Sequence, residues 1–304
     1  MRNPLSKRTV IGLGELLWDM FPSGKQLGGA PANFAYILNL LGDLGVVASR
    51  VGQDDLGGEA ISRVKGLGLQ AREIQTDPVH PTGSVEVALD SAGQPKFGIK
   101  QSVAWDFLDW TPEWRALAKA CDAVCFGSLA QRSPRSRETI HAFLETAGKS
   151  AVCVFDVNLR QCFHSPELIS SSARVAHILK LNHEELPVVT KMLGYESSDE
   201  KSAARWLQKK YNLRLVCVTR GARGSLMVNG NNETEHPGFQ VKVADTVGAG
   251  DAFTAALVHH FLRGASLAAM SEAANQLGSW VASQVGAMPV PDQTRLENLR
   301  AAGR

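Results

Sequence analysis

The chain has 304 residues and a formal net charge of +2; 44% of its residues are hydrophobic and 20% are charged. These proportions are typical of a globular protein that buries a substantial core. Because the sequence has no basic block, we expect no nucleic acid as a partner. Because no apolar run approaches the roughly 20 residues of a membrane helix, we expect no membrane partner either.

The amino-terminal segment and the cysteines predict a cytoplasmic protein. The apolar residues before Glu15 are too few for the hydrophobic region of a secretion signal. The five cysteines are scattered, and their odd number argues against a complete disulfide framework. Cys153 and Cys217 fall within apolar runs, where we expect free and buried thiols.

Apolar runs alternate with amphipathic segments from the first run onward. Continuous runs of Val, Ile, Leu and Cys predict strands that are covered on both faces. In chain order these runs are Thr9–Leu13, Gly45–Val51, Ala123–Phe126, Val152–Asp156, Ile178–Leu181, Leu215–Thr219 and Ser225–Val228.

Helical periodicity appears between these runs. The expected helices are Pro31–Leu41, Gly57–Lys65, Arg135–Ala147, Pro166–Ala176 and Glu200–Tyr211, with N-caps at Asp54, Ser133, Ser165 and Asp199. Two further helices should follow Val247, with a break near Gly264. The alternation predicts βαβ units, and therefore an α/β fold in which a mostly parallel sheet lies between two layers of helices.

Two segments depart from this alternation. Gly83–Asp90 alternates with period two, and a turn at 91–93 leads into a second strand at Gln94–Lys100, which predicts a hairpin. Short extended pieces are also expected within residues 15–28. We interpret 15–28 and 83–101 as one small, discontinuous β-sheet that acts as a lid over a cleft. A plain protruding hairpin is the alternative.

The strongest chemical motif is Asp245–Asp251 (DTVGAGD), which leads directly into an apolar helix. A Gly-Ala-Gly turn at a helix start presents backbone N–H groups, and the helix dipole adds positive charge there. Such a turn can hold a transferring phosphoryl group, and Asp251 can accept a proton from an attacking hydroxyl. By spacing alone, a glycine-rich loop with an acidic cap remains an equal alternative.

This heptapeptide resembles the carboxyl-terminal signature D-T-x-G-A-G-D of the ribokinase-like (PfkB) carbohydrate kinase family. Other blocks resemble the family in order and spacing: Gly28–Ala35 with Gly42 and Gly52, Asn182–Glu185 (N-x-x-E), Thr219–Gly224 (T-x-G-x-x-G) and Gly286–Pro289. The expected elements between the blocks also match the family's layout. The resemblance therefore covers essentially the whole chain, which we expect to form a single ribokinase-like domain over 1–304.

The resemblance implies an ATP-dependent sugar kinase that uses Mg²⁺ and, as in many relatives, K⁺. Asp251 would be the general base, and Gly248, Ala249 and Gly250 would form the anion hole. The implied sugar-binding residues are Asp19, Gly28, Gly29, Asn33 and Arg160; the implied nucleotide-binding residues are Asn182, Thr219, Gly221, Gly224, Thr246, Gly248, Gly250 and Asn275. Glu185 would act on magnesium through water, since this ion keeps several of its waters, and Asp245 would belong to the loop that holds potassium.

Plainer interpretations exist for several of these residues. Asp19 is alternatively a turn aspartate, and Asn33 a helix-surface asparagine. Arg160 is alternatively the partner of Asp156 or of a surface carboxylate in a structural ion pair. Phe97 and Ile99 share one face of the second hairpin strand, from which we expect them to press on the sugar.

Two segments bear on the substrate. Gly14–Pro22 resembles the G-E-x-L-x-D-x-x-P start typical of fructokinases, and Asp156–Arg160 resembles their D-x-N-x-R strand end. However, relatives that act on 2-keto-3-deoxygluconate have a similar arginine, and Phe97–Gln101 departs from the F-x-F-Y-R-like stretch of fructokinases. Fructokinase is the first expectation; the alternatives are a 2-keto-3-deoxygluconate kinase, a ribokinase, a nucleoside kinase and a non-catalytic sugar sensor.

Two further expectations concern other partners. The start Gly12–Leu17 lacks the third glycine of a dinucleotide-binding G-x-G-x-x-G, which disfavours an oxidoreductase. Lid hairpins of the family often pair between subunits, and an exposed two-stranded lid has an edge to cover. We therefore expect a homodimer formed through the lid.

Overall fold

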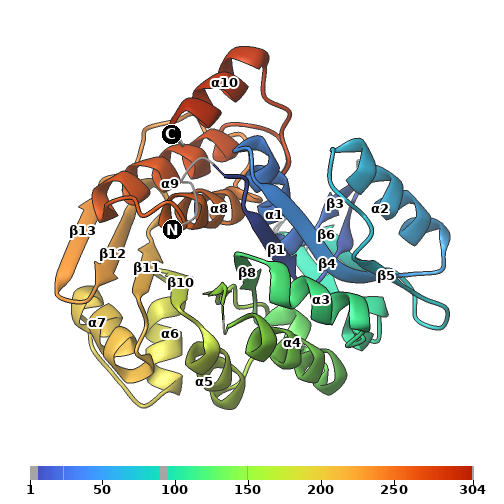
Figure 1. The fold of residues 1–304 in the computed structure, drawn as a ribbon, viewed down its shortest axis with the longest axis horizontal. Helices are drawn as coiled ribbons and strands as arrows, with labels where there is room; N and C mark the ends of the chain where they lie inside the picture. The colour runs from blue at the N-terminus through green and yellow to red at the C-terminus, as the bar shows by residue number, and fades with distance from the viewer. Residues whose placement is uncertain (1–5, 23, 90–94, 149, 303–304) are drawn as a thin grey trace.

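The computed structural model describes residues 6–22, 24–89, 95–148 and 150–302, and it describes their side chains except at 87–89, 95–97 and 300–302. A large sheet runs through the molecule with the strand order β13-β12-β11-β10-β9-β8-β1-β4-β5 (Figure 1). The bounds are β1 Thr9–Leu13, β4 Leu44–Gly52, β5 Ile74–Asp77, β8 Ala123–Phe126, β9 Val152–Asp156, β10 Ile178–Asn182, β11 Leu215–Thr219, β12 Ser225–Asn229 and β13 Asn232–His236.

The large sheet is mostly parallel. Neighbouring strands are parallel from β11 across to β5, and only the pairs that involve β12 and β13 at the other end are antiparallel. Because parallel neighbours require crossover connections, helices cover both faces. The carboxyl ends of the parallel strands therefore meet at one edge of the sheet.

Helices form a layer on each side of this sheet (Figure 1). One layer packs into the core with β-strand side chains such as Val10 and Val47; it contains α1 Ala30–Leu40, α2 Asp55–Gly66, α8 Ala249–Phe261, α9 Leu267–Ala282 and α10 Gln293–Ala302. The opposite layer packs with Ile11 and Val124; it contains α3 Pro112–Ala120, α4 Pro134–Ala147, α5 Pro166–Val175, α6 Glu185–Met192 and α7 Glu200–Tyr211. The predicted three-layer α/β/α architecture is confirmed.

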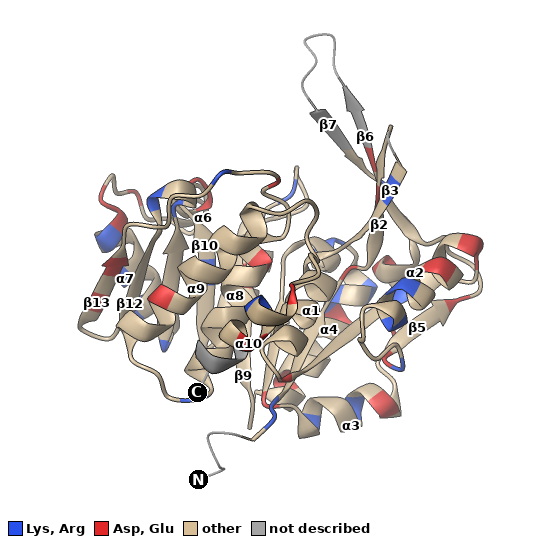
Figure 2. Ribbon diagram, turned by 90° about the horizontal axis from the view of Figure 1, so that it is seen from above, with Lys and Arg blue, Asp and Glu red and all other residues tan. Residues whose placement is uncertain are grey.

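A second, smaller sheet joins the two segments that depart from the βαβ alternation. Its order is β3-β2-β6-β7, with β2 Leu17–Phe21, β3 Gly24–Gly28, β6 Gly83–Leu89 and β7 Pro95–Ile99. Strands β2 and β6 are parallel, and the outer pairs are antiparallel. Figure 2 shows β2 and β3 standing away from the body of the molecule. The predicted small sheet is thus confirmed, and its strands come from two distant segments of the chain.

Side-chain caps define the starts of several helices. Asp54, Ser165 and Asp199 each accept a hydrogen bond from a backbone N–H of the first turn, as predicted. Ser133 is the N-cap residue of α4, as predicted, but its side chain makes no capping hydrogen bond. Pro134 follows it, and its fixed φ already suits the first helical position. In the described part of the chain, no helix is long and apolar enough to cross a membrane.

A buried ionic cluster ties the start of the chain and α1 to the far end of α8. Asp43 lies between α1 and β4 and is 1% exposed. Its Oδ2 lies 2.7 Å from His259 Nδ1, and Arg263 Nη2 donates to its Oδ1 at 2.8 Å. The backbone N–H of Arg8 also donates to Oδ1. Burial raises the pKa of Asp43, but the hydrogen bonds from His259 and Arg263 outweigh burial and hold this pKa below its usual value.

Replacing this carboxylate should destabilise the fold. We expect Asp43→Ala to lower the free energy of unfolding at pH 7 by about 3 kcal/mol, because it leaves Arg263 partly buried without its counter-ion. Urea denaturation measures the change. A group with a depressed folded-state pKa stabilises the fold above its unfolded pKa and loses this effect as the pH falls. The difference from the unsubstituted protein should therefore shrink in acid.

The matched control is Glu138→Gln on an exposed position of α4, which should change the free energy of unfolding by less than about 0.5 kcal/mol. Equal losses for Asp43→Ala and Glu138→Gln would contradict a specific role for the cluster.

Candidate active site

The glycine turn at 248–250 forms the start of α8 and requires its glycines. Gly248 is the N-cap residue, has a φ of 79° in the left-handed region, and provides no side-chain cap. A Cβ at this position would lie 2.5 Å from the Cβ of Ala287. The first turn of α8 therefore keeps backbone N–H groups available, and the helix dipole makes their surroundings positive.

Asp245 fixes the loop that precedes this turn. Its Oδ1 accepts a hydrogen bond from Val247 N at 3.0 Å, and its Oδ2 accepts one from Gly286 N at 3.2 Å. The carboxylate thus joins the 245–251 loop to the Gly286–Pro289 segment, which is another of the blocks that resemble the family. Thr246, the next residue, is exposed.

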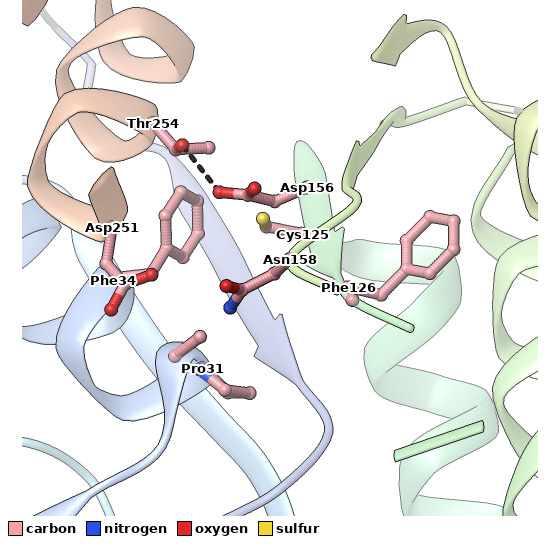
Figure 3. A pocket seen from close by; sticks show the side chains of 10 residues that line it. Pro31, Phe34, Cys125, Phe126, Asp156, Asn158, Asp251 and Thr254 are labelled. Atoms are coloured by element: carbon pink, nitrogen blue, oxygen red, sulfur yellow. Dashed lines mark hydrogen bonds between the residues drawn. The ribbon is translucent and has the colours of Figure 1, made fainter. Parts of the chain in front are cut away.

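A pocket opens where α1, β8, β9 and α8 meet at the carboxyl edge of the sheet (Figure 3). The side chains of Asp251 and Asn158 approach it from opposite sides. Its lining residues are Ala30, Pro31, Phe34, Cys125, Phe126, Gly127, Asp156, Asn158, Asp251 and Thr254. This edge is where ligands bind in open α/β sheets.

Asp251 is held in the first turn of α8 by Asn33 of α1. Asn33 Nδ2 donates to Asp251 Oδ2 at 2.8 Å. Asn33 is only 4% exposed, so it is not a helix-surface asparagine. Burial and the charge of Asp156 raise the pKa of Asp251 to about 6, while Asn33, Lys180 and Arg160 act in the opposite direction. The carboxylate is therefore ionised at neutral pH. Neutral pH lies only slightly above this pKa, as suits a general base.

Gly28 and Gly29 allow Asp19 and the backbone of Glu15 to lie close to the chain. A Cβ on Gly28 would lie 2.4 Å from Asp19 Oδ2, and one on Gly29 would lie 2.5 Å from the carbonyl oxygen of Glu15. Gly29 also has a φ of 108°, which side chains disfavour. Asp19 lies on β2, and it is regularly paired within the small sheet, opposite Gln26 and Val85. It is therefore a strand residue and not a turn aspartate.

The charge of Arg160 reaches the acidic groups on this side of the site. Burial raises the pKa of Asp19 to about 6, and Arg160 lowers it. Burial likewise raises the pKa of Glu15 to about 7, with Arg160 again acting to lower it and Asp251 acting to raise it. Arg160 itself is exposed and donates to the carbonyl oxygen of Leu159. Asp156 forms an ion pair with Lys180 and not with Arg160.

Glu185 and Asn182 connect the ends of β9 and β10. Glu185 Oε1 accepts from Leu159 N at 2.7 Å, and its Oε2 accepts from Asn182 N at 2.8 Å. Asn182 Oδ1 accepts from the backbone N–H groups of Glu184 and Glu185. Each Glu185 oxygen retains a second acceptor site, which fits a contact with a metal-bound water. Among the residues that the structure describes, no group of three or more His, Cys, Asp and Glu could hold a metal ion directly.

The remaining expected nucleotide residues lie at the end of β11, in the turn before β12 and in α9. Thr219 ends β11, and Gly221 and Gly224 shape the following turn with φ values of 59° and 78°. A Cβ on Gly224 would lie 1.9 Å from the carbonyl oxygen of His236. Asn275 of α9 is buried and donates to Ser225 Oγ and to the carbonyl oxygen of Ser271, both at 2.8 Å. An adenine contact by Asn275 stays a prediction.

The structure describes only one of the two hairpin side chains that we expect to press on the sugar. The side chain of Phe97 lies outside the described residues. Ile99 is half-buried and packs against the core cluster that includes Trp105 and Leu108. Its contact with a sugar remains untested.

Comparison with known proteins decides the family. Residues 19–294 match the pfkB family carbohydrate kinases. The chain belongs to this family. A fructokinase from Vibrio alginolyticus is 30% identical to it over 304 residues, which cover 93% of this chain and 96% of that protein.

The fold of this pfkB kinase is similar to that of solved structures along nearly the whole chain. A sugar kinase from Pyrococcus horikoshii in complex with ATP is 27% identical, with a TM-score of 0.81 over 96% of this chain and 98% of that one. A double mutant of the Vibrio cholerae fructokinase, with fructose, ADP and a potassium ion bound, is 25% identical, with a TM-score of 0.81 over 96% and 98% of the two chains.

The pfkB kinase contains site groups to which sequence reasoning gave no role. Glu15 stands in the fructokinase-like start, and Thr254 lies one helical turn after Gly250. Lys180 interrupts the otherwise apolar strand Ile178–Leu181, and a charge within such a run is the signal by which it could have been found.

The turn glycines provide a direct test of the site's geometry. We expect Gly248→Ala to cost about 1–3 kcal/mol more than Gly264→Ala in the free energy of unfolding. Both glycines have left-handed φ values, of 79° and 74°, but only Gly248 would bring its Cβ into contact with Ala287, since Gly264 faces open space. Thermal and urea denaturation of the two variants isolate the clash from the backbone strain. Equal costs would show that Gly248 is not constrained by its neighbour.

Proposed function

We propose that this pfkB kinase transfers the γ-phosphoryl group of ATP to a hydroxyl of fructose, with Asp251 as the general base. The observation that carries the proposal is that Asp251 lines the pocket and stands in the first turn of α8, directly after the 248–250 turn. The 30% identity to a fructokinase over nearly the whole chain supports the choice of sugar.

The proposed reaction is a single in-line displacement. The attacking sugar hydroxyl gives its proton to Asp251 as its oxygen forms a bond to the γ-phosphorus. The bond from that phosphorus to the β–γ bridging oxygen breaks, and ADP leaves with the electron pair. Asn33 occupies Asp251 Oδ2, which leaves Oδ1 to accept the proton. The N–H groups at Gly248–Gly250 stabilise the charge that develops on the transferring group.

Two metal ions belong to the proposal. Mg²⁺, when bound, would neutralise phosphate charge, and Glu185 would contact it through water while the nucleotide phosphates and further waters hold it. Asp245 shapes the loop in which K⁺ would lie. The potassium ion bound by the Vibrio cholerae fructokinase double mutant supports a role for this ion in the proposed reaction.

We further propose that the small sheet acts as a lid. Its strand β2 carries Asp19, which would accept hydrogen bonds from sugar hydroxyls, and Asn33 Oδ1 is a buried acceptor without a partner among the described residues. Closure of the sheet would exclude water, which otherwise competes with the sugar for the phosphoryl group.

The charges around the pocket favour a neutral sugar over a sugar acid. The charge of Arg160 already acts on Glu15, Asp19 and Asp251, so an acidic substrate would compete with these groups for one guanidinium. Lys100 on the small-sheet side is paired with Glu86 at 3.4 Å. Arg160 remains the residue that would clamp the carboxylate of 2-keto-3-deoxygluconate, the alternative substrate.

An ADP-release assay with Mg-ATP tests the proposed reaction. The phosphoryl acceptors are fructose, ribose, tagatose, 2-keto-3-deoxygluconate and the nucleoside adenosine, each with and without potassium. We expect the highest kcat/KM with fructose, and we expect Asp251→Asn to reduce kcat by about 10²–10⁴-fold because it removes the base. Asp55→Asn, an exposed carboxylate on α2, is the control and should retain full activity.

The outcomes separate chemistry from substrate. Turnover restricted to 2-keto-3-deoxygluconate would retain the mechanism and reassign Arg160 as a carboxylate clamp. Turnover restricted to adenosine would point to a nucleoside kinase, and tight sugar binding without turnover would point to a sensor. Full activity of Asp251→Asn would remove Asp251 as the base.

The raised pKa of Asp251 predicts the pH profile. Since the base acts in its ionised form, kcat/KM should rise with pH through about 6. Asn33→Ala removes a donor that lowers this pKa, so its rise should occur at higher pH than in the unsubstituted enzyme. Asn229→Ala, at an exposed position of β12, should leave the profile unchanged. A rise at or below the original pH in Asn33→Ala would be inconsistent with this role.

A further inference from the structure

A buried ion pair lies under the first turn of α8. Lys180 and Asp156 are register partners on the parallel strands β10 and β9. Lys180 Nζ lies 3.0 Å from Asp156 Oδ1 and 3.1 Å from Oδ2, and the two residues are 7% and 5% exposed. Neither residue has a part in the transfer described above.

This pair contacts the anion-binding turn from below. Thr254 Oγ1 lies 2.8 Å from Asp156 Oδ2 and 3.0 Å from the carbonyl oxygen of Gly250, so it joins the pair to the turn (Figure 3). A Cβ on Gly250 would lie only 3.1 Å from Lys180 Nζ. The ammonium group therefore packs directly against Gly250.

Fold stability alone does not explain this placement. A buried ion pair is often no more stabilising than well-packed apolar residues of the same volume. In addition, the amino-terminal end of a helix carries partial positive charge, which repels a nearby cation. A lysine at this end becomes favourable when an anion occupies the turn.

We propose that Lys180 is a positioning residue that places a buried positive charge beneath the 248–250 turn and so stabilises the phosphoryl group during its transfer. Asp156 holds the ammonium in place, and Thr254 links the pair to α8. This inference rests on the proposed kinase reaction and adds a residue to it.

Lys180 also belongs to the set of groups that act on the base. The groups around Asp251 come from every neighbouring element: Glu15 after β1, Asn33 of α1, Cys125 of β8, Asp156 of β9, Arg160 after β9 and Lys180 of β10. Removal of Lys180 takes away a positive charge and leaves Asp156 without its counter-ion. Both changes favour protonation of Asp251.

Steady-state kinetics of Lys180→Met test the inference, using the sugar that the unsubstituted enzyme turns over best. We expect kcat to fall about 100-fold, as it does when one oxyanion-stabilising group is lost. The KM for the sugar should stay within about threefold, and the acid limb of the kcat/KM profile should move to higher pH. Lys191→Met, an exposed lysine on α6, should match the unsubstituted enzyme.

A double variant distinguishes two roles of Lys180: a positive charge for the phosphoryl group, and neutralisation of Asp156. It also leaves no unpaired carboxylate in the core. In Lys180→Met/Asp156→Asn, the acid limb should return toward its original pH because both charges are gone, whereas kcat should stay low. Circular dichroism and urea denaturation confirm that each variant is folded.

Three results would overturn the inference. The first is an unchanged kcat in Lys180→Met, and the second is a loss of kcat without movement of the acid limb, which would indicate a structural role alone. The third is full recovery of kcat in the double variant, which would limit Lys180 to neutralising Asp156. An unsubstituted chain inactive on every sugar would instead contradict the proposed function itself.

Discussion

The docking of the α8 start onto the carboxyl edge of the sheet is the constraint on which the site depends. A helix start can bind an anion only if its N–H groups are not already capped by a side chain. Gly248 satisfies this condition because it turns the chain without offering a cap. The turn is fixed instead through its other contacts: Asn33 holds Asp251, and Asp156 holds Thr254. Helix α1 and the end of strand β9, from distant parts of the sequence, thus set the position of the turn.

The sequence predicts the buried part of this architecture closely. Strands covered on both faces consist almost wholly of apolar residues, and the predicted ranges Ala123–Phe126, Val152–Asp156 and Leu215–Thr219 coincide with the observed strands. The polar edge strand β13 escapes prediction because Asn232–His236 has no apolar period. Its carboxylates instead pair with cations of α7 and of the loop after β11, including Arg205 and Arg220. The short elements β5, α3, α6 and α10 were likewise not predicted.

The site follows from the sequence only in part. Motif spacing correctly brings Asp251 and the glycine turn to a helix start, because these features are local. Contacts between elements are not local. The bond from Asn33 to Asp251 joins residues 218 positions apart, and the register that pairs Lys180 with Asp156 belongs to the sheet. The resemblance implied Asn33 as a sugar ligand, and only the assembled fold adds its contact with Asp251.

One carboxylate links the two sides of the cleft. Asn158 and Gln161, near Arg160, have φ values of 47° and 48°. Residues other than glycine adopt such values only at a cost in free energy. Such a loop needs outside support, and Glu185 provides it by accepting a hydrogen bond from the intervening Leu159 N–H. Because its other oxygen accepts from Asn182 N, Glu185 fixes the loop after β9 and the loop after β10 together. A disturbance of either loop is therefore transmitted to the other, and the position of Arg160 depends on a residue whose sequence motif points to the nucleotide.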